Sequence, residues 1–248
     1  MGVIAVVNQK GGAGKSTVAI NLAACLASYG KRVLVIDADP QGTASTLLGE
    51  DIWSLNETMY DAMTGKIALT NLIRETEIKG LYIAPTNNTL SYAEDYLDKH
   101  PEGGYILKQE IEKLEGFDYI IIDSPPNLKI FTLNTLVACD MALVAVQAES
   151  AAVGGIILLQ QLMDAVDETR EIKIDRRYLI NMYDSRANLC KQVDAALREL
   201  YGEAVFKTII PRSIKFGECY WYGKPISLTA PESVGANAYN KLTEELTK

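Results

Sequence analysis

The amino-acid sequence predicts an α/β fold, in which a mostly parallel, twisted sheet has helices on both faces. Apolar runs of strand length alternate with amphipathic segments of helix length along the chain, and this alternation is typical of parallel sheets. Two of the runs, RVLVID and DYIIID, are almost unbroken series of Val, Leu and Ile, as expected for strands buried on both faces. No repeat, low-complexity tract or flexible linker divides the sequence, so we expect one domain over residues 1–248.

The elements follow from these two patterns in chain order. The apolar runs predict strands at GVIAVVN (2–8), RVLVID (32–37), LYIAP (81–85), DYIIID (118–123), MALVAVQ (141–147), RYLINMY (177–183) and VFKTIIP (205–211). The amphipathic segments predict helices over residues 16–29, 55–64, 69–76, 89–98, 103–115, 130–138, 152–168, 189–201 and 234–246. The cycle begins at the first residues, so we expect no separate N-terminal DNA-binding module.

Composition excludes several classes of protein. Apolar residues make up 48% of the chain and charged residues 23%, the balance of an ordinary globular protein. No apolar run is long enough to span a membrane, and the N-terminus lacks the features of a signal peptide. Four scattered cysteines without a CxxC pair and a single histidine disfavour a zinc site and indicate reduced thiols in the cytoplasm.

A loop with the features of a phosphate-binding site follows the first expected strand. Its glycines allow the backbone N–H groups to point inward at phosphate oxygens, and the helix that begins near Ser16 adds its positive end. Lys15 would reach the β- and γ-phosphates, and the Ser16 hydroxyl would bind Mg²⁺. Gln9 replaces the first glycine of the common motif, while Lys10 is an additional lysine inside the loop. The predicted nucleotide-binding residues of this loop are Gly11, Gly12, Ala13, Gly14, Lys15, Ser16 and Thr17.

Acidic residues end two of the expected strands. Asp37 and Asp39 lie at the end of the second strand, and Asp123 ends the strand DYIIID. Ligands of open α/β sheets collect at the carboxyl ends of the strands. Asp123 is in the position of an aspartate that is linked to Mg²⁺ in P-loop ATPases. We therefore predict a site for ATP or ADP with Mg²⁺, in which Ser16 and Asp123 are the metal-linked residues.

The three motifs NQKGGAGKST, VIDADPQG and IIIDSPPNL together resemble the ParA-type ATPases with a deviant Walker A motif, which partition DNA or position cargo. The likeness extends over NMYDSRANL, VFKTIIPRSIKFGE and YGKPI, and so covers nearly the whole chain. It implies an ATP-dependent homodimer that holds two ATP molecules between its subunits. It also implies weak ATPase activity that a ParB-like or other cargo adaptor stimulates.

The resemblance assigns a role to each matching residue. Lys10 would cross the dimer interface to the partner's phosphates, and Lys15 would bind the phosphates of its own subunit. Asp39 would position or activate the attacking water, and Asp123 would lie in the magnesium shell. Asn181 and the Pro211 segment would frame the adenine, since an amide can both donate and accept at an adenine edge. An ordinary turn-forming role for Asn181 at the end of its strand stays open.

The resemblance also implies sequence-independent binding of DNA by the ATP dimer, through Arg186 and Lys215. Both lie in residues 171–224, where ten basic and seven acidic residues give a net charge of +3, although the whole chain carries −8. Contacts of such residues with phosphates would weaken as salt rises. The basic residues Lys191, Arg198, Lys207 and Lys224 are weaker candidates. We expect a cytoplasmic, nucleoid-associated protein with no membrane partner.

The sequence departs from the family pattern in three places. Residues 149–155 keep Glu149 but lack the aromatic residues and the second acid expected there, GECYW occupies residues 217–221, and Lys129 replaces a glycine. Trp221 and Tyr220 either pack against a helix or meet a partner. Three other interpretations also stay open: a membrane-associated division regulator of the MinD type, a relative of the nitrogenase iron protein, and a non-catalytic DNA-binding regulator that uses nucleotide as a switch.

Overall fold

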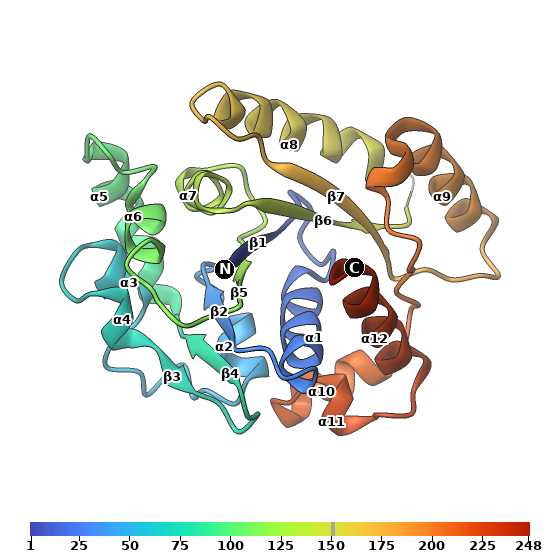
Figure 1. Cartoon of the computed structure of the whole chain (residues 1–248), viewed down its shortest axis with the longest axis horizontal. Helices are drawn as coiled ribbons and strands as arrows, with labels where there is room; N and C mark the ends of the chain where they lie inside the picture. Colours follow the sequence, from blue (N-terminus) through green and yellow to red (C-terminus); the bar gives the residue numbers. More distant parts are fainter. Residues whose placement is uncertain (150–151) are drawn as a thin grey trace.

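One seven-stranded sheet forms the centre of the molecule (Figure 1). The computed structural model describes residues 1–149 and 152–248. In chain order the strands are β1 (Gly2–Val7), β2 (Val33–Asp37), β3 (Arg74–Glu75), β4 (Leu81–Ala84), β5 (Tyr119–Asp123), β6 (Met141–Gln147) and β7 (Asp175–Asn181). Their order in the sheet is β3-β4-β2-β5-β1-β6-β7, and every pair is parallel except β3 with β4. The predicted fold class is confirmed.

Helices cover both faces of the sheet (Figure 1). One apolar core lies under α3 (Met59–Met63), α4 (Leu69–Leu72), α5 (Ala93–Lys99), α6 (Ile106–Ile111), α7 (Ile130–Ala138), α8 (Ala152–Asp167) and α9 (Asn188–Tyr201). The other lies under α1 (Lys15–Ser28), α2 (Thr43–Leu47), α10 (Lys215–Tyr222), α11 (Ile226–Thr229) and α12 (Val234–Leu246). Short 3₁₀ helices occur at η1 (Asn88–Tyr92) and η2 (Gly202–Ala204). Among the described residues, no helix is both long and apolar enough to cross a bilayer.

The segment 205–211 is not the regular strand that its apolar pattern predicts. It runs beside β7 and makes only isolated bridges, Tyr178 with Val205 and Tyr183 with Pro211. The carboxylate of Glu245 on α12 accepts hydrogen bonds from the backbone N–H groups of Lys207 and Thr208, at 2.7 and 3.0 Å. These N–H groups are therefore directed to a side chain, which interrupts the strand ladder. The expected helix 69–76 is likewise shorter, because β3 occupies its second half.

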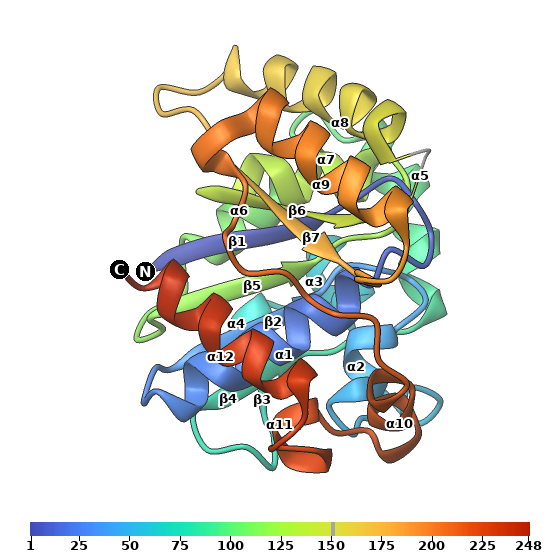
Figure 2. The same cartoon turned by 90° about the vertical axis from the view of Figure 1, so that its right-hand side faces the viewer.

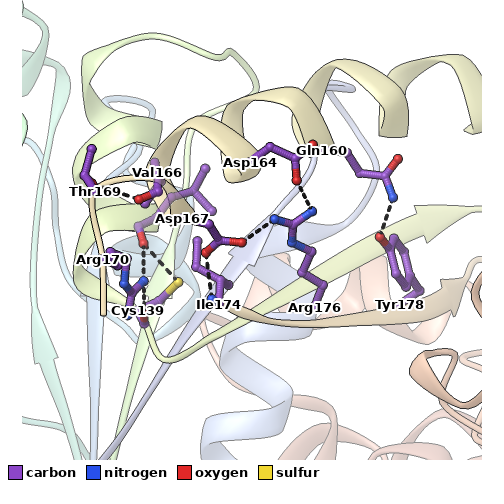
Figure 3. A network of polar contacts seen from close by, with 11 residues as sticks. Cys139, Gln160, Asp164, Val166, Asp167, Thr169, Arg170, Ile174, Arg176 and Tyr178 are labelled. Atoms are coloured by element: carbon purple, nitrogen blue, oxygen red, sulfur yellow. Dashed lines mark hydrogen bonds and ion pairs between the residues drawn. The ribbon is translucent and has the colours of Figure 1, made fainter. Parts of the chain in front are cut away.

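A polar network fastens α8 to β7 at the edge of the sheet (Figure 3). Arg176 forms ion pairs with Asp164 and with the less exposed Asp167. The amide of Gln160 donates a hydrogen bond of 2.9 Å to the Tyr178 hydroxyl. Arg170 donates to the carbonyl oxygens of Leu136 and Cys139, at the end of α7. The network begins at the amino end of β7, so it holds the layers together away from the carboxyl ends of the strands.

Candidate active site

The loop between β1 and α1 lies at the carboxyl edge of the sheet (Figure 2). Gly12 and Gly14 have φ angles of +75° and +83°, a region in which side chains with a Cβ are strained. A Cβ on Gly14 would also lie 2.6 Å from the Nδ2 atom of Asn181. Glycine is therefore required at position 14 by both backbone conformation and space, and α1 begins directly after it.

Lys15 points into the interior rather than into solvent, since its exposed fraction is only 6%. Burial lowers the pKa of its ammonium group, while the nearby carboxylates of Asp123 and Asp39 raise it. Lys15 is therefore pre-organised beside the loop by burial and by two acidic residues. It can bind an anion without a large rearrangement of the protein.

Asp37 and Asp123 are neighbours in the sheet, because β2 and β5 pair in register at these residues. Asp37 accepts hydrogen bonds from the backbone N–H and the hydroxyl of Ser45, both at 2.7 Å, and burial raises its pKa to about 7. Neither carboxylate oxygen of Asp123 has a hydrogen-bond partner among the described residues. Burial and the neighbouring Asp37 raise the pKa of Asp123 well above its usual value, although the close Ser16 hydroxyl lowers it.

The unsatisfied oxygens of Asp123 are the feature that fits a divalent cation. Buried carboxylates without hydrogen bonds are rare, and a missing ion is one explanation for them. In the described part of the chain, no three His, Cys, Asp or Glu side chains gather into a metal-binding cluster. A magnesium ion here would therefore need ligands from phosphate oxygens and water in addition to Ser16 and Asp123, as is usual for this metal.

Asp39 lies just beyond the end of β2 and is 7% exposed. Its carboxylate accepts a hydrogen bond of 3.0 Å from the backbone N–H of Gln41. Burial raises the pKa of Asp39, while the Gln41 bond and the charge of Lys15 lower it. Asp39 is thus a nearly buried carboxylate held by its own turn and facing the loop lysine. A carboxylate in that place is suited to orient a water molecule.

Lys10 differs from Lys15 in its surroundings. Its side chain is 41% exposed and forms an ion pair with Glu149, while its backbone N–H donates to the Asn8 side chain at 2.8 Å. Sequence reasoning did not predict Glu149 as its partner, because the two residues are far apart in the chain and meet only where β6 ends beside the loop. The remainder of the departure at 149–155 includes residues 150 and 151, which lie outside the described residues.

The two residues expected near adenine lie at the same edge. Asn181 is buried, and its amide donates a hydrogen bond of 2.8 Å to the carbonyl of Ala13 while accepting one from the N–H of Met182. Met182 has a φ of +53°, so the chain turns sharply directly after Asn181. Pro211 is half-buried and bridges to Tyr183. Asn181 thus fixes the phosphate loop, a role that the sequence did not predict.

The basic residues expected to bind DNA are on the surface and not in the loop. The Arg186 side chain is 88% exposed and is held by Asp184, whose pKa it lowers to about 2. Lys215 begins α10 and pairs with Glu218 at 2.8 Å. Among the weaker candidates, Arg198 pairs with Asp194 and Lys224 with Glu77, while Lys191 and Lys207 are exposed.

Two functional neighbours were missed by the sequence reasoning. Ser45 donates a hydrogen bond to the Asp37 carboxylate. It lies on α2, a helix that the apolar pattern did not predict. Gln41 holds Asp39 through its backbone N–H, which carries no side-chain signal. The turn DPQG that contains Gln41 was visible in the sequence, and its Pro and Gly are typical turn residues. A glycine loop between strand and helix, with a buried lysine among strand-end carboxylates, defines a P-loop ATPase.

Comparisons with known proteins identify the family. A family described as "AAA domain" matches residues 1–176. Chromosome partitioning protein ParA of Myxococcus xanthus is 38% identical over 99% of this chain and 88% of its own length. Sporulation initiation inhibitor protein Soj of Bacillus subtilis is 37% identical over 98% of this chain and 97% of its own length. The chain belongs to the ParA/Soj family of the ParA/MinD superfamily.

A solved structure agrees with this assignment. Cobyrinic acid a,c-diamide synthase from Mycobacterium smegmatis, with bound ADP and magnesium, superposes with a TM-score of 0.87. The two sequences are 31% identical, and the superposition covers 100% of this chain and 94% of the synthase chain. The fold described above, with its phosphate loop at the carboxyl edge of the sheet, is therefore shared with a protein that holds a nucleotide and a metal ion.

Proposed function

We propose that this protein is an ATP-dependent dimerising ATPase that binds DNA without sequence preference and positions or segregates a cargo. ATP or ADP with Mg²⁺ would occupy the loop of residues 11–17. The observation that supports this most is the contrast between the two loop lysines. Lys15 is 6% exposed and faces Asp39 and Asp123, whereas the Lys10 side chain is 41% exposed at the rim. A rim lysine that is held only by an exposed ion pair with Glu149 is accessible to a second subunit.

The residues of each subunit would divide the work of hydrolysis. Backbone N–H groups of the glycine loop and Lys15 hold the phosphates, and Lys10 reaches those of the other copy. Ser16 and Asp123 would hold Mg²⁺, which would supply positive charge against the phosphate oxygens. Asp39 orients the attacking water in line with the γ-phosphate, and the lysines offset charge that develops in the transition state.

Partners follow from the family and from the charge of the surface. The names of the relatives describe chromosome partitioning, so we propose bulk DNA of the nucleoid as the surface on which the ATP dimer assembles. Arg186 and Lys215 would contact DNA phosphates. A cargo-bound adaptor, ParB-like or of another kind, would stimulate hydrolysis, after which the subunits separate and leave the DNA.

The test separates the two lysines. We expect Lys15→Ala to abolish binding of fluorescent ATP, because the phosphates lose their buried counter-charge. Lys10→Ala should retain ATP binding but lose the ATP-dependent dimer, measured by light scattering with a slowly hydrolysed analogue. The exposed Lys129, with a side chain 64% exposed, gives a matched control, and Lys129→Ala should still dimerise. A dimer of Lys10→Ala that forms normally with ATP contradicts the proposal.

The alternative functions have their own outcomes. A switch without catalysis predicts equal hydrolysis by wild type and Asp39→Ala, even with DNA and an adaptor present. A membrane regulator of the MinD type predicts ATP-dependent pelleting with liposomes. The last helix gives no support for it, since the apolar residues Tyr239 and Leu242 of α12 are fully buried. An iron–sulfur protein would be coloured when purified.

A further inference from the structure

A hollow of about 400 Å³ lies directly behind the turn that holds Asp39. Its outer walls are two aromatic side chains, Trp53 and Tyr220, which are 81% and 57% exposed. Tyr220 belongs to α10, which packs against α2 (Figure 2). The sequence GECYW at this place departs from the family pattern, and its aromatic residues have no role in the site described above.

The charged groups of the hollow are acidic. Glu50 and Asp51 line it, and Glu50 is already paired with the basic Arg74 at 3.0 Å. The only hydrogen bond that the Asp51 carboxylate accepts within the described chain is from the N–H of Trp53, at 3.2 Å. An exposed carboxylate beside an exposed indole attracts a cation through charge and through the ring face. The same carboxylates repel the phosphates of a nucleic acid.

The walls of the hollow are fixed rather than loose. The side-chain amide of Asn87 donates a hydrogen bond of 3.1 Å to the carbonyl of Ile52. Asn87 itself caps η1, since its side-chain Oδ1 accepts a hydrogen bond from the N–H of Thr89 at 3.0 Å. The loop that carries Asp51 and Trp53 is thus tied to a second element, and a ligand would not need to order it first.

The floor of the hollow reaches the catalytic turn. Pro40 and Gln41 line it, and the N–H of Gln41 is the donor that holds the Asp39 carboxylate at 3.0 Å. The next residue continues the turn, with the N–H of Gly42 bonded to the carbonyl of Asp39 at 2.9 Å. A ligand seated against Gln41 would therefore act on the group that orients Asp39.

We infer that this hollow is an effector site for a basic segment of a partner protein, whose arginine or lysine side chain lies between Trp53 and Tyr220 and pairs with Asp51. Occupation of the site changes the rate of ATP hydrolysis by repositioning the turn Asp39–Gly42. The inference rests on the proposed function, because it supplies the route by which an adaptor would stimulate the ATPase.

Binding is tested first, on the full chain with ADP. The chain contains two tryptophans, so Trp221→Phe leaves Trp53 as the only indole. We expect N-acetylated pentaarginine amide to change its fluorescence with saturation, and pentaglutamate to have no effect. By calorimetry on the protein with both indoles, Asp51→Asn should weaken pentaarginine binding at least about fivefold, and Trp53→Leu by a similar factor. Asp95→Asn, at an exposed acid on α5, should stay within about twofold.

The second measurement is steady-state hydrolysis at saturating ATP. Pentaarginine should change kcat at least about threefold in the wild type and in Asp95→Asn, and leave kcat unchanged in Asp51→Asn. Trp53→Phe, which keeps a ring face, should retain part of the response. A structural defect alone would lower hydrolysis in the absence of peptide as well, so the unstimulated rate of each variant separates the two causes.

Several outcomes would overturn the inference. Binding that is equal in wild type and Asp51→Asn places the peptide elsewhere, and binding without any change in kcat removes the link to Asp39. A Trp53 signal given by a 12-base-pair DNA duplex instead of pentaarginine makes the surface a nucleic-acid site. Failure of ATP-dependent dimerisation would refute the proposed function, but it leaves the ADP-state binding result standing, so the two failures are distinguishable.

Discussion

Lys10 is ion-paired with Glu149 of its own chain, although 139 positions separate the two residues. Glu149 lies just beyond the end of β6, and Lys10 lies in the loop after β1, so the parallel pairing of β1 with β6 brings them together. If Lys10 serves the other subunit of an ATP dimer, it must first leave Glu149. The ion pair within the isolated subunit would then compete with dimer formation.

Removing that competition should favour the dimer. We expect Glu149→Gln to tighten ATP-dependent dimerisation by up to about fivefold, because an exposed ion pair contributes about 0.2–1 kcal/mol. The dimer dissociation constant is measured by analytical ultracentrifugation with a slowly hydrolysed ATP analogue. Glu203→Gln, at an exposed residue of η2, is the control and should have no effect. Weaker dimerisation of Glu149→Gln would mean that Glu149 itself contributes to the interface.

Asp123→Asn should have opposite effects on the free and the nucleotide-bound protein. Without nucleotide, loss of a buried carboxylate that has no hydrogen bond should raise the free energy of unfolding by about 1–3 kcal/mol. With Mg²⁺ and ATP, the variant should gain less thermal stability than the wild type, because the magnesium shell is incomplete. Melting curves with EDTA and with Mg²⁺-ATP measure both effects. An unchanged gain with Mg²⁺-ATP would show that Asp123 is not linked to the metal.

The fold and the loop were predictable because both depend on local patterns. Buried parallel strands such as IIID have a strong apolar signal, and the glycines before Lys15 have a required conformation at Gly14. The remaining features depend on contacts between distant segments. Residues 205–211 fail to form a regular strand because Glu245, in the last helix, accepts two of their N–H groups. No pattern within seven residues could predict that competition.

Thiol reactivity gives a prediction on pH. Burial raises the pKa of the Cys25 thiol to about 11 and that of Cys139 to about 12. The pKa of each thiol is therefore higher in the native than in the unfolded chain. At a pH between the unfolded and the native pKa, unfolding releases a proton from the thiol. The stability of the fold should therefore fall as pH rises from about 9 to 11. At pH 8 the native protein should react slowly with a disulfide reagent, and all four thiols should react promptly in guanidinium. Rapid reaction of Cys139 in the native protein would contradict its burial.

The network between α8 and β7 provides a matched pair of acids. Asp167 and Asp164 both pair with Arg176, but their side chains are 7% and 64% exposed. Asp167 also accepts a hydrogen bond of 2.8 Å from the N–H of Ile174. We expect Asp167→Ala to lower the free energy of unfolding, measured in urea, by about 3 kcal/mol, since it leaves a partly buried charge and an N–H unpaired. Asp164→Ala should lower it by less than about 1 kcal/mol. Equal costs would show that burial does not govern this network. ATP affinity should be unchanged in both variants.

The acids that hold the basic surface residues should limit DNA binding. Lys215 pairs with Glu218 through both carboxylate oxygens at 2.8 Å, so a DNA phosphate must displace that carboxylate. We expect Glu218→Gln to raise DNA affinity, and Lys215→Ala to lower it and to reduce the dependence of log K on log salt by about 1. Fluorescence anisotropy of a labelled duplex, at several salt concentrations with the ATP analogue, measures both. Lys99→Ala, at an exposed lysine of α5, should leave the salt dependence unchanged. If Lys215→Ala retains the full salt dependence, this lysine contacts no phosphate and the DNA surface lies elsewhere.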